Sequence, residues 1–225
     1  MSQPSIEWQT VTKFIRQLNH DLRNYLNALE LQAAFVSEIV EQPEAKEEMK
    51  RLREMTAELG AHLQRLSVQL GQIRVTSLTY QARELVEDLQ AKITREFPEQ
   101  SASIEWKDGL GAEPIAIDPT LLLEAFVELF RNAFSHERGE RALSFEARST
   151  NDGIEFILRE PKTKFESDTA SWGERPLGRI RQGHYGLGLY RARGIFEQHH
   201  GHFRAEFDPS NSSLVTTVTL PRKTA

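Results

Sequence analysis

Two long amphipathic stripes in the first third of the chain constrain its fold more than any other feature. Apolar residues recur at steps of three and four over residues 6–42 and again over residues 52–73, the period of one face of an α-helix. Pro43 and the acids beside it are typical of a helix start after a short turn. We therefore predict two helices, each about 45 Å long, that form an antiparallel hairpin. The apolar positions are Phe14, Leu18, Leu22, Tyr25, Leu29, Ala33, Val36 and Val40, then Leu52, Met55, Leu59, Leu63, Leu66, Leu70 and Ile73.

One hairpin cannot cover both stripes by itself. Pairing with a second copy would bury them in a four-helix bundle, so we expect a homodimer. A plain coiled-coil hairpin is the alternative that the stripes alone leave open. His20 lies two positions after Leu18, about 200° around the helix, so it is predicted to face solvent while Leu18 and Leu22 point inward.

The rest of the chain has a mixed pattern. After a linker over residues 75–79, a shorter helix carries Leu85, Val86, Leu89 and Ile93. Short strands are predicted at residues 103–106, 114–117, 143–148, 154–158, 203–207 and 214–220, with a turn at residues 151–153. Helices are predicted from Asp118-Pro119 to about Ser135 and from about Leu187 to His199. The fold class is therefore α+β: a helical hairpin over residues 1–75, then an α/β sandwich over residues 80–225.

Composition and charge exclude several kinds of site and partner. The chain has 225 residues, no cysteine and a net charge of -5. The absence of cysteine excludes disulfides and cysteine-based sites. The negative net charge gives no indication of a nucleic-acid partner. The sequence shows no membrane segment, because no apolar run approaches the roughly 18 residues that a span needs, and no cleaved leader is recognisable. We expect a cytoplasmic protein.

The first motif is His20-Asp21-Leu22-Arg23-Asn24. An exposed imidazole can attack a phosphoryl group through one ring nitrogen when the other N–H is held by an acceptor, and Asp21 can be that acceptor and base. Asn24 lies at i+4, on the same helix face. The segment resembles the H-box of histidine kinases, which implies that His20 is phosphorylated and that Asn24 orients water or a partner's acyl phosphate. A solvated polar face is the alternative.

The second motif is a polar stripe at Glu128, Asn132 and His136, spaced by four residues on a predicted helix. It resembles the N-box of the Bergerat ATP-binding fold. The resemblance implies that Asn132 coordinates Mg²⁺, that Glu128 assists nearby and that His136 approaches phosphate. The amide oxygen of Asn132 is a hard ligand that suits Mg²⁺. The apolar positions between them, predicted to face the sheet, are Leu122, Phe126, Leu129 and Ala133.

The third motif contains Gly183, Gly186, Leu187 and Gly188 and precedes a helix. Glycines at a helix N-terminus let backbone N–H groups approach an anion. The segment resembles the G-box of the same fold. Three boxes in this order, over nearly the whole chain, resemble the core of a two-component sensor histidine kinase, a dimerising phosphotransfer hairpin followed by a Bergerat (GHKL) ATPase domain. The resemblance implies ATP and Mg²⁺ as cofactors and a response-regulator receiver domain as partner.

One family motif is altered. Where the family has an Asp-x-Gly-x-Gly turn that binds adenine, this chain has Glu160, with Lys162 and Lys164 in place of the glycines. If those positions need positive φ, each lysine costs about 1 kcal/mol, and both side chains would lie where adenine binds. A shifted alignment that uses Asp168 and Gly173 lacks the glycine spacing. Residues 165–182 would form the lid over ATP.

Two enzymatic functions follow from these motifs. The first is a kinase that autophosphorylates His20 from ATP and passes the phosphoryl group to a regulator aspartate. The alternative is a kinase-derived phosphotransferase or phosphatase whose ATPase-like domain no longer binds ATP and docks the regulator. Asn132 and the Gly186-Leu187-Gly188 run favour the first, whereas Lys162 and Lys164 favour the second. A dimeric scaffold without activity is the third alternative.

Overall fold

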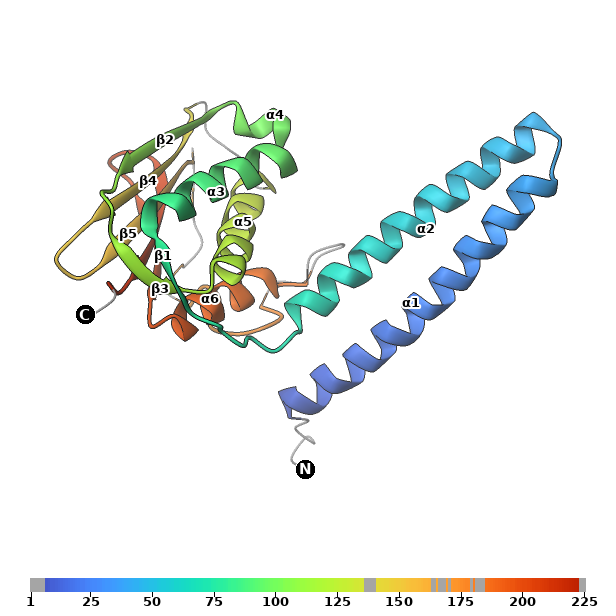
Figure 1. Ribbon diagram of the computed structural model, residues 1–225, viewed down its shortest axis with the longest axis horizontal. Helices are drawn as coiled ribbons and strands as arrows, with labels where there is room; N and C mark the ends of the chain where they lie inside the picture. The colour runs from blue at the N-terminus through green and yellow to red at the C-terminus, as the bar shows by residue number, and fades with distance from the viewer. Residues whose placement is uncertain are drawn as a thin grey trace. The chain divides into compact units, whose positions relative to one another are not determined.

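The computed structural model describes residues 7–135, 141–162, 165, 169, 171–178, 180 and 185–222. The chain divides into two compact units, one that ends at Gln72 and one that begins at Ile73. Figure 1 shows the first as a helical hairpin and the second as a sheet with helices packed on it.

The first unit is the predicted antiparallel hairpin. Helix α1 spans Trp8–Ile39 and helix α2 spans Pro43–Gln69, with Pro43 in the first turn of α2. An ion pair joins the helices, with Arg53 Nε 2.8 Å from Glu30 Oε1. The only described α1 residues that are fully buried are Asn19 and Ala33.

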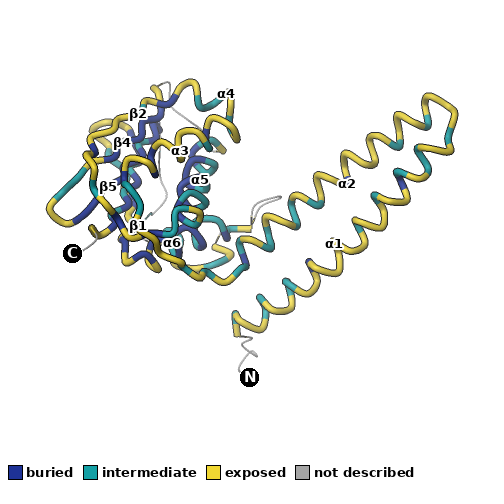
Figure 2. Tube along the Cα trace, in the orientation of Figure 1, coloured by how far each residue is buried: buried dark blue, intermediate teal, exposed yellow. Residues whose placement is uncertain are grey.

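The predicted apolar stripe of α1 does not face α2 within one chain. Leu18 and Leu22 are 45% and 41% exposed, and Phe14 and Tyr25 are more exposed still, so the expectation that Leu18 and Leu22 point inward is wrong for the single hairpin. Ala33 is the one stripe residue that is buried against α2. Figure 2 shows that most of the hairpin is exposed. α1 therefore has one face toward α2 and a second, apolar face that is open. Other large apolar side chains that are exposed in the hairpin are Leu29, Leu31, Phe35, Ile39, Leu52, Met55, Leu59 and Val68.

The second unit is built on a five-stranded sheet in the order β2-β4-β5-β7-β6. β2 and β4 are parallel, and the other neighbours are antiparallel. β1 and β3 form a separate antiparallel pair, so the predicted linker ends earlier than expected, because Leu78 and Thr79 already belong to β1. The strands are β1 (Leu78–Gln81), β2 (Ile104–Gly109), β3 (Pro114–Ile117), β4 (Leu143–Ser149), β5 (Ile154–Pro161), β6 (His202–Asp208) and β7 (Ser213–Leu220).

Helices cover one face of this sheet (Figure 1), which confirms the α+β fold class. Because side chains alternate along a strand, Ile154, Phe156 and Leu158 of β5 face the helices and join one hydrophobic core with them. Phe126 lies at its centre, with its ring 5.1 Å from Phe156 and 5.2 Å from Phe196. The helices are α3 (Ala82–Glu96), the short α4 (Pro98–Ser101), α5 (Pro119–Ser135) and α6 (Gly188–Gln198).

None of the helices in the described part of the chain combines the length and the hydropathy that crossing a membrane requires.

Candidate functional site

The first candidate group lies on α1 and consists of His20, Asp21 and Asn24. The His20 side chain is 68% exposed, and its Nδ1 lies 3.2 Å from Asp21 Oδ1 and 3.4 Å from Asn24 Nδ2. Gln17 Nε2 donates to the same Asp21 oxygen at 2.9 Å. The structure thus brings together the three residues of the first motif and adds Gln17, which holds the carboxylate one turn earlier on the helix.

The shorter of the two contacts at Nδ1, the one with Asp21, sets the tautomer of His20, because Asn24 Nδ2 is itself a donor and makes no hydrogen bond to a protonated Nδ1. A carboxylate can only accept hydrogen bonds, so the contact with Asp21 requires a proton on Nδ1. The lone pair of the neutral ring is then on Nε2, for which no partner is found among the described residues. Nε2 is therefore the nitrogen that can act as a nucleophile.

The second group is the polar face of α5. Leu122, Phe126, Leu129 and Ala133 are buried toward the sheet, as the spacing predicted. Glu128 and Asn132 lie on the other side, and His136 falls outside the described residues. Asn132 is half-buried, and its side chain makes no hydrogen bond to any residue that the structure describes. Its amide is therefore free to bind a ligand.

Glu128 meets the N-terminus of α6. A Cβ placed on Gly188 would lie 1.8 Å from Glu128 Oε1, so only glycine fits between the carboxylate and the helix backbone. The other Glu128 oxygen accepts from Arg131 Nη1 at 2.6 Å. The carboxylate thus lies where the positive end of the helix dipole favours an anion. Of the predicted residues here, Gly186 has a φ of 64°, Leu187 is buried, and Gly183 lies outside the described residues.

The altered adenine motif lies at the end of β5. Glu160 and Lys162 are both buried, and Lys162 Nζ lies 3.1 Å from Glu160 Oε2. Lys162 donates its backbone N–H to Ser212 O at 2.8 Å, so the strand pairing continues to this residue instead of opening into a glycine turn. Lys162 is not among the residues with positive φ, and the predicted backbone strain is therefore wrong for this lysine. Lys164 and Asp168 lie outside the described residues.

The described part of the predicted lid packs on α6 and β6. Gly173, with a φ of 71°, leaves no room for a Cβ, which would lie 2.7 Å from Leu189 O. Arg193 of α6 donates to Trp172 O at 2.9 Å and forms an ion pair with Glu174 at 3.4 Å. Phe165 stacks on Phe207 of β6 with ring centroids 5.7 Å apart and meets Trp172 edge-on at the same distance.

These side chains decide whether an adenine nucleotide fits. Glu160 follows Ile154, Phe156 and Leu158 in the alternation of β5, so it lies on the helix-covered face of the sheet. The carboxylate that would accept a hydrogen bond from adenine is already bound by the Lys162 ammonium. An adenine amino group would therefore have to share Glu160 with Lys162, whereas the Asn132 amide makes no hydrogen bond to a described residue.

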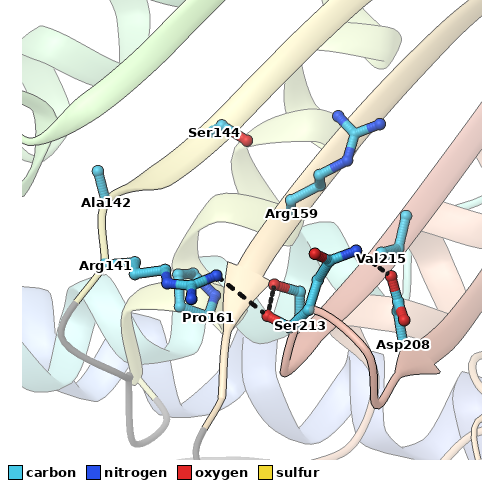
Figure 3. A pocket seen from close by; sticks show the side chains of 9 residues that line it. Arg141, Ala142, Ser144, Arg159, Pro161, Asp208, Ser213 and Val215 are labelled. Carbon is cyan, nitrogen blue, oxygen red and sulfur yellow. Dashed lines mark hydrogen bonds between the residues drawn. The ribbon is translucent and has the colours of Figure 1, made fainter.

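A pocket of about 300 Å³ lies on the opposite, open face of the sheet (Figure 3). The two arginines that line it already have partners within the protein. Arg159 Nη1 lies 2.7 Å from Glu146 Oε2, and Arg141 Nη1 donates to Asn211 O at 3.5 Å. None of the predicted site residues lines it. Its lining residues are Arg141, Ala142, Ser144, Arg159, Pro161, Asp208, Asn211, Ser213 and Val215.

The sequence patterns did not single out two polar groups that the structure shows to be buried. Arg191 of α6 is buried, and its Nε lies 2.5 Å from Glu124 Oε1 of α5, an ion pair that links the two helices carrying the second and third motifs. Asn19 is buried between α1 and α2. A signal for Asn19 exists, because it is a polar residue four positions after Ile15 on a face that is otherwise inward. Arg191 gives no such signal, since its partner is 67 residues away.

No protein-family model and no curated protein sequence matches the chain. Solved structures do. The histidine kinase AdeS of Acinetobacter baumannii is 15% identical with a TM-score of 0.54, over 91% of this chain and 98% of that chain. The mycobacterial sensor histidine kinase MprB is 16% identical with a TM-score of 0.54, over 67% of this chain and all of that chain.

Full-length ShkA, solved in complex with AMPPNP, is 16% identical with a TM-score of 0.70. The match covers 95% of this chain but 46% of that chain. At identities this low the likeness is one of fold. The matches with AdeS and ShkA include both units of the chain, while the share that MprB covers is close to the length of the α/β unit.

Proposed function

This chain has the fold of a histidine kinase core with a GHKL-type ATPase domain, and from that fold we propose that it carries a phosphoryl group on His20 in two-component signalling. The observation that supports this proposal best is the geometry at His20, where Asp21 holds Nδ1 at 3.2 Å and leaves Nε2 exposed. A phosphotransfer protein needs an imidazole that a partner can reach, with its outer nitrogen unprotonated.

The proposed reaction is a reversible transfer with a receiver-domain aspartate. His20 Nε2 attacks the phosphorus of the aspartyl phosphate, the bond between phosphorus and the aspartate oxygen breaks, and the carboxylate leaves with its electron pair. Asp21 stabilises the positive charge that develops on the ring through the Nδ1–H bond. Asn24, 3.4 Å from the ring, can donate to an oxygen of the phosphoryl group or orient water for its hydrolysis.

We propose the phosphotransferase, rather than the ATP-dependent kinase, as the main activity. The buried Glu160–Lys162 pair occupies the adenine-binding carboxylate, and the segment around Trp172 is fixed on α6 by Arg193. On this proposal the α/β unit docks the regulator instead of binding ATP. The exposed apolar face of the hairpin would be covered by a second copy in a homodimer.

ATP-dependent autophosphorylation is the second candidate. The free amide of Asn132 and the approach of Glu128 to Gly188 at the start of α6 favour it, because both lie at the phosphate end of the site. Titration with Mg-ATP separates the two candidates. The phosphotransferase shows no saturable binding at millimolar nucleotide, whereas a kinase binds ATP and labels itself.

Transfer itself is tested with receiver domains phosphorylated by acetyl phosphate. The wild-type chain is expected to gain an acid-labile phosphoryl group from a cognate receiver, and His20→Gln is expected to gain none. Label on the His20→Gln variant, or no label on the wild type with any receiver of the source organism, would refute the proposal.

A further inference from the structure

The residue before His20 is buried between the two helices. Asn19 is 2% exposed, and its Nδ2 donates to Leu63 O at 2.7 Å and to Ser67 Oγ at 2.5 Å, both on α2. The side chain therefore spans from α1 to the last two turns of α2. Its Oδ1 is buried without a partner among the described residues.

Arg16 makes a second connection one turn earlier on the same face of α1. Its Nε donates to Leu70 O at 2.9 Å, and Nη2 contacts the same oxygen. Leu70 is the C-cap of α2, whose last carbonyl groups have no partner within the helix. Asn19 and Arg16, which we call the polar clamp, thus join α1 to the end of α2 through two sets of hydrogen bonds about one helical turn apart.

Among the described residues, His20 makes no hydrogen bond or ion pair with α2. Its described contacts, to Asp21 and Asn24, are all within α1. The direction of the imidazole in the bundle therefore depends on the rotation of α1 about its axis. The apolar neighbours Leu18 and Leu22 do not fix this rotation within one chain, since both are more than 40% exposed.

We propose that Asn19, acting through Leu63 and Ser67, is a positioning residue that fixes the rotation of α1 and so the direction in which His20 presents Nε2. The inference rests on the proposed phosphotransfer at His20. A buried polar residue that leaves one oxygen unpaired lowers stability, whereas a fixed helix register is the best attested gain from such residues. The polar clamp therefore contributes more to the orientation of His20 than to the free energy of unfolding of the hairpin.

The test compares three variants of the 225-residue chain. Asn19→Leu keeps the branched shape and removes both hydrogen bonds. Ser67→Val removes the hydroxyl group, and Ser67→Thr, whose side chain has the shape of valine, retains the hydroxyl as the matched control. We expect Asn19→Leu and Ser67→Val to melt within a few degrees of the wild type, or higher, and Ser67→Thr to behave as the wild type in every assay.

Helix rotation is measured directly. The chain has no cysteine, so spin labels on Arg23→Cys in α1 and Arg65→Cys in α2, diluted with unlabelled chains, report one intrachain distance. Asn19→Leu is expected to shift or broaden this distance distribution, whereas Ser67→Thr leaves it unchanged. An unchanged distribution in Asn19→Leu and Ser67→Val would overturn the inference.

The functional measurement uses two phosphoryl donors. Phosphoramidate is small and needs only an exposed imidazole, so its rate of labelling His20 is expected to be equal in all variants. Transfer from the phosphorylated cognate receiver depends on the direction in which His20 presents Nε2. Its rate is expected to fall about tenfold or more in Asn19→Leu. Equal transfer rates would overturn the inference. Failure of every receiver with the wild type would instead refute the proposed function, and the spin-label distances would still decide on the polar clamp.

Discussion

At the scale of single residues, the arrangement around His20 divides the work between the two ring nitrogens. Asp21 and Asn24 both approach Nδ1, and Nε2 is left to the solvent. Gln17 adds a hydrogen bond of 2.9 Å to Asp21, so the carboxylate is held from the turn before it. All of these residues belong to one helix, which explains why a short motif can specify the site.

Asp21→Asn is expected to slow transfer from a phosphorylated receiver to His20 by about 100-fold. The amide keeps the size of the carboxylate but does not stabilise positive charge on the ring. The rate of acid-labile label appearing on His20 measures this. Gln17→Ala, which removes only the hydrogen bond to Asp21, should lower the rate by less than Asp21→Asn. Equal rates in the wild type and Asp21→Asn would show that the carboxylate has no part in the transfer.

Breaking the buried pair at the end of β5 gives a second prediction at this scale. Lys162→Met leaves the Glu160 carboxylate without its ammonium partner and should lower the free energy of unfolding of the α/β unit by about 3 kcal/mol. The double variant Glu160→Met/Lys162→Met should recover most of this loss, because a buried ion pair can be replaced by apolar side chains at little cost. Urea denaturation measures both. A double variant less stable than Lys162→Met would contradict the explanation.

At the scale of elements, α5 and α6 meet through polar and charged groups at their ends. Glu128 packs against Gly188, and Glu124 is paired with Arg191. Residues from two of the sequence motifs are therefore packed directly against each other. The same segment of α6 holds the backbone of Trp172 through Arg193.

Substituting glycines in two helices tests this packing. Gly188→Ala should destabilise the α/β unit by about 1–3 kcal/mol, because the new methyl group would displace the Glu128 carboxylate from Arg131. Gly60→Ala in α2, where a Cβ meets nothing within 4 Å, should stabilise the hairpin by about 0.5–1 kcal/mol. Thermal denaturation by circular dichroism distinguishes them, and a neutral Gly188→Ala would show that Glu128 moves freely.

At the scale of the whole molecule, the hairpin leaves much apolar surface uncovered. Met55 and Leu59 of α2 are 68% and 49% exposed, and Phe14 and Leu29 of α1 are 65% and 52% exposed. Soluble proteins rarely expose so many large apolar side chains unless a partner covers them. A second copy can do so with the same stripes in a symmetric bundle.

Leu59→Asp is therefore expected to convert a dimer into a monomer or to unfold the hairpin, because it places an unpaired charge in the buried interface. Light scattering at micromolar concentration gives the molar mass. Gln32→Asp, which adds the same charge at an exposed polar position of α1, should remain dimeric. A wild-type chain that is monomeric would refute the homodimer.

The sequence alone determined the local structure. The periods of three and four gave the hairpin and the buried face of α5, and the alternating segments gave the strands of the sheet, because these patterns reflect which neighbouring side chains share a face. The His20, Asp21 and Asn24 group was also within reach, since i+1 and i+4 neighbours on a helix are fixed by its geometry.

Only the tertiary structure decided the contacts between distant segments. The sequence predicted backbone strain at Lys162, but the structure shows no positive φ there and a buried ion pair with Glu160 instead. Asn19 reaches Ser67 across 48 positions. Such partners are set by how elements pack, which no short-range pattern records. The sequence therefore specified the group at His20, Asp21 and Asn24, and the packing decided what surrounds it and which partner Glu160 has.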